Sequence, residues 1–131
     1  MAPLYHLQLN VSHTGLAFYR DFFGELGYQI TQLSSEHLAV SDGQTDFWVI
    51  QTEDQHAHRP YHRKGTGLNH LAFRLPRRAD VDQFVATFLI PRGITPLYGS
   101  PKFYPEYAAQ YYAVYFEDLD RLKLEVMALA E

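Results

Sequence analysis

The chain contains no cysteine among its 131 residues. A disulfide framework, a thiolate metal site and a cysteine nucleophile are therefore excluded, and any bound metal must be held by nitrogen and oxygen ligands. No apolar run approaches the roughly 20 residues that span a bilayer, and residues 1–9 lack the basic start and apolar core of a signal peptide. We therefore expect a cytoplasmic protein with no membrane partner.

The chain also lacks an excess of positive charge, since its formal net charge is -4. Nucleic-acid binding normally needs a basic stripe, so we expect a small-molecule partner and no nucleic acid. Aromatic residues make up 15% of the chain, including 10 tyrosines. Such rings suit a ligand pocket, and they equally suit an ordinary core or a dimer interface.

An imperfect internal repeat is the clearest pattern that is present. The segment YHLQLNV surrounds His6, and NHLAFRL surrounds His70. Both segments alternate between apolar and polar residues, which predicts strands at residues 5–11 and 68–75 with each histidine on the face away from the apolar side chains. Each is followed by a polar link, an amphipathic stretch and a glycine, so we expect two copies of one unit.

The remaining pattern extends this order through both halves. It predicts an α+β fold of two βαβββ modules, residues 1–64 with a polar linker at the end and residues 65–131, which share one core. The expected helices cover residues 16–26, capped by Ser12, and 81–89. The other expected strands cover residues 28–33, 37–40, 45–51, 95–98, 110–117 and 122–127.

A third chemically active residue, Glu125, falls in the last expected strand on the histidines' side. Two imidazoles and one carboxylate form a facial triad, which holds a divalent metal ion and leaves its other positions open. The simpler interpretation is that each histidine is merely hydrogen-bonded and that Glu125 pairs with Arg74 or Lys123. Fe²⁺ or Mn²⁺ is the favoured cofactor, although the triad also accommodates Zn²⁺, Ni²⁺ or Co²⁺.

The segments YHLQLNV, FYRDFFGELGY, FWVIQ, GLNHLAFRL and YYAVYFEDLDRLKLEVM together resemble the vicinal oxygen chelate superfamily. This superfamily includes glyoxalase I, fosfomycin-resistance proteins, extradiol dioxygenases and bleomycin-resistance proteins. The resemblance implies a cupped mixed sheet with helices on its outer face, a homodimer, and the metal ligands His6, His70 and Glu125. Gln51 falls where glyoxalase I has a further ligand, usually a carboxylate. An amide cannot act as a base, which makes glyoxalase I chemistry less favoured, and Gln51 could simply end a strand.

The resemblance also points to residues that would act beside the metal. Tyr115 stands ten residues before Glu125, as does the tyrosine that contacts the metal-bound oxygen in extradiol dioxygenases. Those enzymes also have an acid/base histidine on a loop before the second ligand strand, where this chain has His62 as the candidate, with His56 and His58 nearby. The alternatives are that Tyr115 only packs and that the linker histidines are solvated.

Two segments near the expected site depart from regular patterns. Residues 98–107, YGSPKFYPEY, alternate poorly and are expected to form an ordered loop over the pocket mouth or against a dimer partner. The turn at residues 118–121 reads Asp-Leu-Asp-Arg where the family usually has Asp-Pro-Asp-Gly. Arg121 therefore takes the place of a glycine that would allow positive φ.

Three functions remain open at this stage. The first is a metal-dependent enzyme that binds vicinal oxygens, with ring-cleaving dioxygenation as the leading reaction. The second is a glyoxalase-type lyase, or a thiol transferase of the fosfomycin type, on the same metal site. The third is a metal-free protein that sequesters an aromatic or cationic drug, although its relatives typically lack the triad.

Overall fold

The computed structural model describes residues 1–59 and 61–131 of the chain. The chain divides into two compact units, with the division between residues 60 and 61. We call residues 1–60 unit 1 and residues 61–131 unit 2. The boundary lies four residues before the one expected from the linker composition, so residues 61–64 belong to unit 2.

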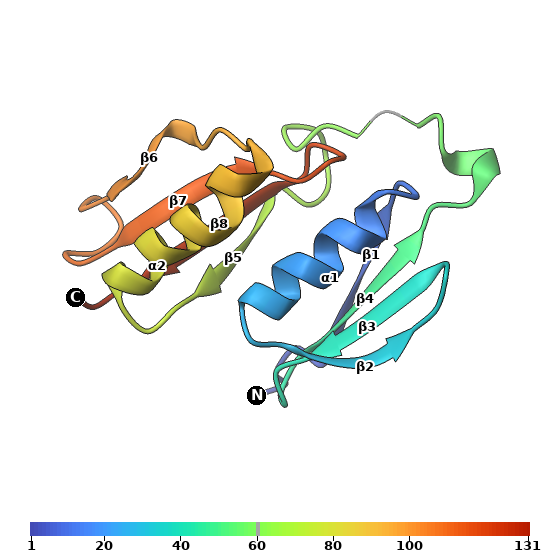
Figure 1. Cartoon of the computed structure of the whole chain (residues 1–131), viewed down its shortest axis with the longest axis horizontal. Coiled ribbons are helices and arrows are strands. Elements are labelled where there is room, and N and C mark those ends of the chain that lie inside the picture. Colours follow the sequence, from blue (N-terminus) through green and yellow to red (C-terminus); the bar gives the residue numbers. More distant parts are fainter. Residues whose placement is uncertain (60) are drawn as a thin grey trace. The chain divides into compact units, whose positions relative to one another are not determined.

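Both units have the expected order of one strand, one helix and three strands (Figure 1). Unit 1 contains β1 His6–Val11, α1 Gly15–Glu25, β2 Gln29–Leu33, β3 His37–Ser41, β4 Asp46–Gln51 and the short 3₁₀ helix η1 Asp54–His56. Unit 2 contains β5 His70–Arg74, α2 Arg78–Phe84, the π-helical turn η2 Val85–Leu89, the 3₁₀ turn η3 Ile90–Arg92, β6 Leu97–Phe103, β7 Tyr112–Glu117 and β8 Lys123–Ala128.

The two sheets have the same topology. Their strand orders are β1-β4-β3-β2 and β5-β8-β7-β6, and in each sheet the first strand runs parallel to the last while the other pairs are antiparallel. The predicted α+β fold of two βαβββ modules is therefore confirmed. Because a crossover of this length places the helix on one face of the sheet, the opposite face is left for other contacts.

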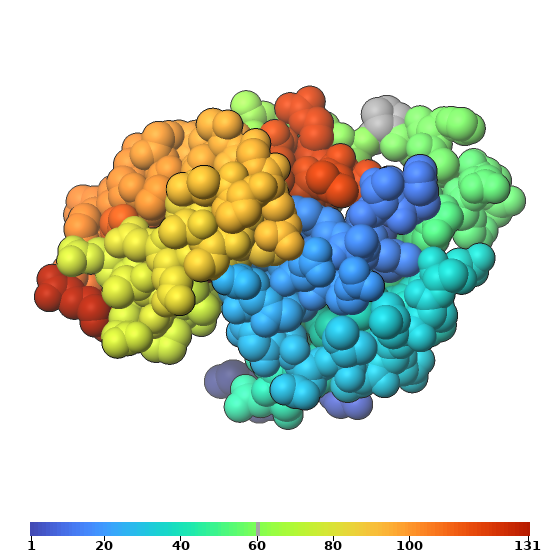
Figure 2. All heavy atoms as spheres, viewed as in Figure 1, coloured from blue at the N-terminus to red at the C-terminus, as the bar shows by residue number. Residues whose placement is uncertain are grey.

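Each helix buries an aromatic stripe against its own sheet. In α1, Phe22 and Phe23 are fully buried, and the Phe23 ring lies 5.0 Å from that of Phe47 on β4. In α2, the Phe84 ring lies 5.7 Å from that of Phe116 on β7. Each fully buried aromatic side chain contributes roughly 1.5–3 kcal/mol from apolar burial. Figure 2 shows α1 in blue and β2 and β3 in cyan along this side of unit 1.

The turns show where the sequence interpretation was incomplete. The α1 helix begins after Thr14, so its N-cap residue is Thr14 and not the predicted Ser12. The Ser12 carbonyl accepts a hydrogen bond from the Gly15 amide. Arg121 adopts positive φ, at 69°, so the turn keeps the backbone conformation that a glycine would allow. The Asp118 carboxylate stabilises that turn by accepting hydrogen bonds from the Asp120 and Leu122 amides, each 2.8 Å long.

The largest correction concerns residues 98–107. The expected loop is wrong for its first half, because residues 97–103 form β6 at the edge of the unit 2 sheet. Tyr98 and Gly99 both have positive φ, 62° and 66°, and the pairing with β7 is irregular between Leu97 and Lys102. These left-handed residues interrupt the side-chain alternation that would otherwise have revealed the strand.

Candidate metal centre

The face of the unit 2 sheet opposite α2 carries His70 and Glu125 side by side. His70 is the first residue of β5 and pairs with Lys123, while Glu125 on β8 pairs with Ala72 and Tyr115. The His70 Nε2 and Glu125 Oε2 atoms are 3.2 Å apart. The Glu125 side chain is only 2% exposed, whereas that of His70 is 35% exposed. The predicted common face of these two residues is confirmed.

Asn69 determines which nitrogen of His70 carries a proton. The Asn69 amide nitrogen donates to the Arg63 carbonyl over 3.0 Å, which directs the amide oxygen toward His70. That oxygen lies 2.7 Å from His70 Nδ1, so Nδ1 must be the donor. Nε2 then faces the Glu125 carboxylate either with a second proton or with a lone pair. Two lone pairs at this distance repel unless a cation lies between them.

The Glu125 carboxylate is oriented from its other side by Tyr111. The Tyr111 hydroxyl donates to Glu125 Oε1 over 2.5 Å, which leaves Oε2 toward His70. Burial, followed by the hydrogen bond and the charge of Glu125, raises the pKa of Tyr111 well above its usual value, so the phenol stays a donor at neutral pH. Among the described residues, Glu125 forms no ion pair with Arg74 or Lys123, so that alternative is wrong.

Tyr115 lies in the same group of side chains. It is buried, with 6% of its surface exposed, and its ring stands edge-on to His70 with centroids 6.1 Å apart. Burial and the nearby Glu125 carboxylate raise the pKa of the Tyr115 phenol strongly. Tyr115 also packs with Tyr104, Ala113 and Met127 in a small apolar cluster. The structure therefore places Tyr115 beside both candidate ligands, where it also has a packing role.

The arrangement fits a divalent ion. Two ligand atoms about 2.1 Å from one ion, separated by 90–109°, lie roughly 3.0–3.4 Å apart, and the observed 3.2 Å falls within this range. The partners of both ligands also match the usual pattern, in which the second ring nitrogen of a ligand histidine donates to an oxygen and the ligand carboxylate accepts a further hydrogen bond. Within the described residues, no group of three His, Asp or Glu side chains is close enough to hold an ion.

His6 and Gln51 both lie in unit 1, where the sheet register separates them. His6 is the first residue of β1, exposed, and pairs with Asp46, whereas Gln51 pairs with Val11 at the other end of the parallel strands. Five residues of strand correspond to about 16 Å. An odd separation also places the two side chains on opposite faces. This register argues against the prediction that Gln51 and His6 bind one ion.

The internal repeat identifies a different counterpart of Glu125 in unit 1. The two histidines begin equivalent strands, and Glu125 comes two residues after the partner of His70. The residue two positions after the partner of His6 is Trp48. Unit 1 therefore carries an indole, not a carboxylate or an amide, at the position that corresponds to Glu125.

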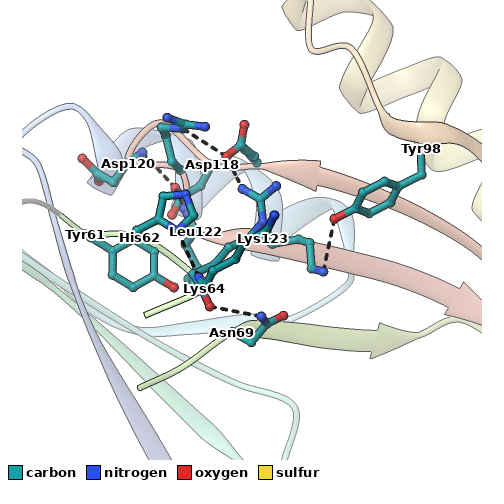
Figure 3. A network of polar contacts seen from close by, with 12 residues as sticks. Tyr61, His62, Lys64, Asn69, Tyr98, Asp118, Asp120, Leu122 and Lys123 are labelled. Carbon is teal, nitrogen blue, oxygen red and sulfur yellow. Dashed lines mark hydrogen bonds and ion pairs between the residues drawn. The ribbon is translucent and has the colours of Figure 1, made fainter. Parts of the chain in front are cut away.

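Among the described residues of unit 2, no contact joins His62 to the His70–Glu125 pair. His62 is exposed, and its Nδ1 accepts a hydrogen bond from the Lys64 amide over 3.1 Å, within its own loop (Figure 3). His56 and His58 lie in unit 1. His56 lines a pocket of about 550 Å³ together with Gln8, Asn10, Ile50, Gln51, Thr52, Glu53 and Arg59. Gln51 therefore borders a polar pocket in unit 1.

Asn69 and Tyr111 are two residues of this site that the sequence interpretation missed. Asn69 had a detectable signal, because an amide directly before a ligand histidine can accept from that histidine's ring. Tyr111 had none, since it lies in the loop before β7 and its approach to Glu125 depends on the path of that loop.

Comparison with known proteins shows which superfamily the chain belongs to. The chain is 38% identical to a solved protein from Bacillus halodurans that is assigned to the glyoxalases, with a TM-score of 0.85 and coverage of 95% of this chain and 94% of that one. It is also 32% identical over 128 residues to the uncharacterized protein YqjT of Bacillus subtilis, covering 95% of this chain and 98% of YqjT. The chain belongs to the vicinal oxygen chelate superfamily.

More distant members of the vicinal oxygen chelate superfamily share the fold. A lactoylglutathione lyase from Agrobacterium tumefaciens aligns with a TM-score of 0.65 at 20% identity, covering 98% of this chain and 94% of that one. A glyoxylase/bleomycin resistance protein/dioxygenase domain from Frankia aligns with a TM-score of 0.70 at 16% identity, covering 98% of each chain. No protein-family model matches the chain. None of the helices in the described residues has the length and apolar character needed to cross a bilayer.

Proposed function

We propose that this protein is a metal-dependent enzyme of the superfamily that binds a small substrate through two neighbouring oxygen atoms. His70 and Glu125 would be two of the metal ligands, and the expectation from the sequence that His6 is a third ligand stays a prediction. The observation that carries the proposal is the position of His70 Nε2, which lies 3.2 Å from the buried Glu125 carboxylate while Nδ1 bonds to Asn69. A divalent ion bound there would polarise the chelating oxygens of the substrate.

The surrounding residues would bind and orient the substrate. Tyr111 holds the Glu125 carboxylate so that only Oε2 points toward His70. Tyr115 lies beside the His70 ring, where its phenol could donate a hydrogen bond to a negatively charged substrate oxygen. The tyrosine-rich cluster around Tyr115 would limit the access of water to that oxygen.

Ring-cleaving dioxygenation with Fe²⁺ or Mn²⁺ is the first reaction to test. A triad with open positions suits that chemistry, and Trp48 at the register equivalent of Glu125 removes the second carboxylate that glyoxalase proton transfer would use. Isomerisation or transfer of a thiol adduct is the second candidate, favoured by the 38% identity to the protein assigned to the glyoxalases.

Metal content is the decisive measurement. We expect the purified protein, reconstituted anaerobically with Fe²⁺ or loaded with Zn²⁺, to bind one ion per chain by elemental analysis. His70→Ala and Glu125→Gln should lose that ion while the circular dichroism spectrum is unchanged. His37→Ala is the matched control, because His37 also begins a strand but its ring bonds to Ser34. Retention of the ion in both ligand variants would refute the proposal.

Oxygen uptake with a catechol panel, compared with turnover of a thiol hemithioacetal under anaerobic conditions, separates the two reactions. Uptake that depends on His70 supports ring cleavage. Anaerobic turnover without any catechol-dependent uptake supports the thiol reaction instead.

We further propose that the protein forms a homodimer. The edge strand β2 is exposed along its whole length and carries Ile30 and Leu33, which are 49% and 56% exposed. Light scattering coupled to size-exclusion chromatography should give twice the mass of one chain, and a monomer mass at micromolar concentration would contradict this.

A further inference from the structure

Lys123 lies directly beside the candidate metal ligands. It is the cross-strand partner of His70, and it stands two residues before Glu125 on the same face of β8. These spacings place its Cα about 5 Å from that of His70 and about 7 Å from that of Glu125. The site therefore has a positive side chain within the reach of a small ligand.

The Lys123 ammonium group is held by aromatic groups. It lies 5.4 Å from the centroids of both the Tyr98 and Tyr115 rings, and it donates to the Tyr98 hydroxyl over 3.4 Å. Among the described residues, Lys123 forms no ion pair with a carboxylate. An ammonium group has three donors, so two remain available, and the Tyr98 hydroxyl keeps its own proton to donate. Figure 3 shows these two polar ends pointing toward one another.

The backbone of β6 is distorted at the point that brings Tyr98 to this position. Regular alternation would direct Leu97 and Tyr98 to opposite faces, but both contact the cluster around Tyr115. The positive φ of Tyr98, 62°, accounts for this change of direction. A left-handed tyrosine is strained, and such strain is concentrated at functional sites. The Tyr98 side chain is also half exposed, so a ligand can reach it.

The Arg63 guanidinium is a second positive group that acts on the Tyr98 hydroxyl. The Arg63 guanidinium is anchored by Glu117 over 2.7 Å, and Arg121 shares the same carboxylate oxygen at 3.3 Å. Partial burial alone would raise the pKa of the Tyr98 phenol, but hydrogen bonds and charges from Lys123 and Arg63 outweigh it, and the net shift is downward. The two positive side chains therefore favour a negatively charged group next to the Tyr98 hydroxyl.

We propose that Lys123 and Tyr98 form an oxyanion subsite, which binds a carboxylate or phosphoryl group of the substrate whose vicinal oxygens reach the metal. This inference rests on the proposed function for the position of the metal. It narrows the substrate class to small anions that carry two neighbouring oxygens and a further negative group. One ring or a short chain would separate that group from the two oxygens.

Matched ligands test the subsite in the metal-loaded protein. We expect 3,4-dihydroxybenzoate to bind at least about tenfold more tightly than catechol, because hydrogen bonds to a charged group are worth a factor of roughly ten to a hundred. Lys123→Met should abolish that preference, and Tyr98→Phe should reduce it. Lys102→Met is the control, because Lys102 also lies over a tyrosine ring, that of Tyr104, at 5.3 Å.

The phosphonate analogue 3,4-dihydroxyphenylphosphonate distinguishes the two anion types. If the carboxylate or the phosphonate binds more tightly than catechol, the result supports the subsite. The tighter of the two anions is then the preferred group. An unchanged ratio of catechol to 3,4-dihydroxybenzoate affinity in Lys123→Met would overturn it.

A metal-free measurement separates failure of the subsite from failure of the proposed function. Inorganic phosphate and benzoate, added to the protein in the presence of EDTA, should shift the amide resonances of Tyr98 and Lys123, and these shifts should be lost in Lys123→Met. If the protein binds no metal but still shows these shifts, the metal proposal fails and the subsite stands. If neither anion shifts these resonances, the subsite is refuted even where the metal binds.

Discussion

The hydrogen bond from Tyr111 to Glu125 makes the sharpest prediction about the site. Tyr111→Phe removes one hydroxyl and keeps the ring, so the buried Glu125 oxygen loses its donor. A hydrogen bond to a charged group contributes about 1.5–3 kcal/mol. At about 3–6 °C per kcal/mol for a chain of this size, we expect the metal-free variant to melt roughly 5–18 °C lower than the wild type.

The same substitution should weaken metal binding. Partners that orient a ligand typically contribute a factor of about 10–100 in metal affinity. Competition with a chromophoric chelator measures this factor, while urea denaturation in EDTA measures the stability loss separately. A loss of stability without a change in metal affinity would mean that Glu125 is a structural carboxylate.

Tyr107→Phe is the matched control for both measurements. Tyr107 lies in the same loop with its ring 5.4 Å from that of Tyr111, but it is 63% exposed, and its hydroxyl has no hydrogen-bond partner among the described residues. The reasoning fails if Tyr111→Phe and Tyr107→Phe melt at the same temperature.

Three further predictions concern single residues. Arg121→Gly should be about 1 kcal/mol more stable than Arg121→Ala in urea, because only glycine relieves the positive φ of 69°; equal stabilities would contradict this. Burial and the hydrogen bond to Asp82 raise the pKa of Tyr112 to about 12. Its neutral phenol therefore stabilises the fold fully below pH 10 and loses this effect as the pH rises toward 12. Between pH 10 and 12 the urea midpoint should therefore decrease less in Tyr112→Phe than in the wild type. Asn69→Ala should weaken metal binding about tenfold, as measured by chelator competition, whereas Asn10→Ala should leave it unchanged. Equal metal affinities in the two variants would mean that Asn69 does not orient His70.

The alternating strands were predictable because the sequence period directly reflects which face is buried. His70 and Glu125 share a face for this reason, and the strands that carry them begin and end within two residues of the predicted bounds. The β6 strand escaped prediction because Tyr98 and Gly99 break that period with left-handed backbone conformations.

Pairing between strands that are distant in the sequence was less predictable. The position of Gln51 relative to His6 depends on the register of two parallel strands, and alternation within either strand does not determine that register. The Tyr111 contact likewise depends on how a loop folds back over the sheet. Local periodicity therefore predicted the faces of the strands, whereas long-range register and loop path determined which residues meet.

Trp48, which occupies the position in unit 1 that corresponds to Glu125 in unit 2, gives the protein an intrinsic fluorescent probe. Trp48 is the only tryptophan in the chain. It faces away from α1, on the same side of its sheet as His6, so its fluorescence is free of signals from any second indole and originates on that side alone. Quenching of this emission by a paramagnetic ion or by an aromatic ligand would therefore report occupancy of that surface without any added label.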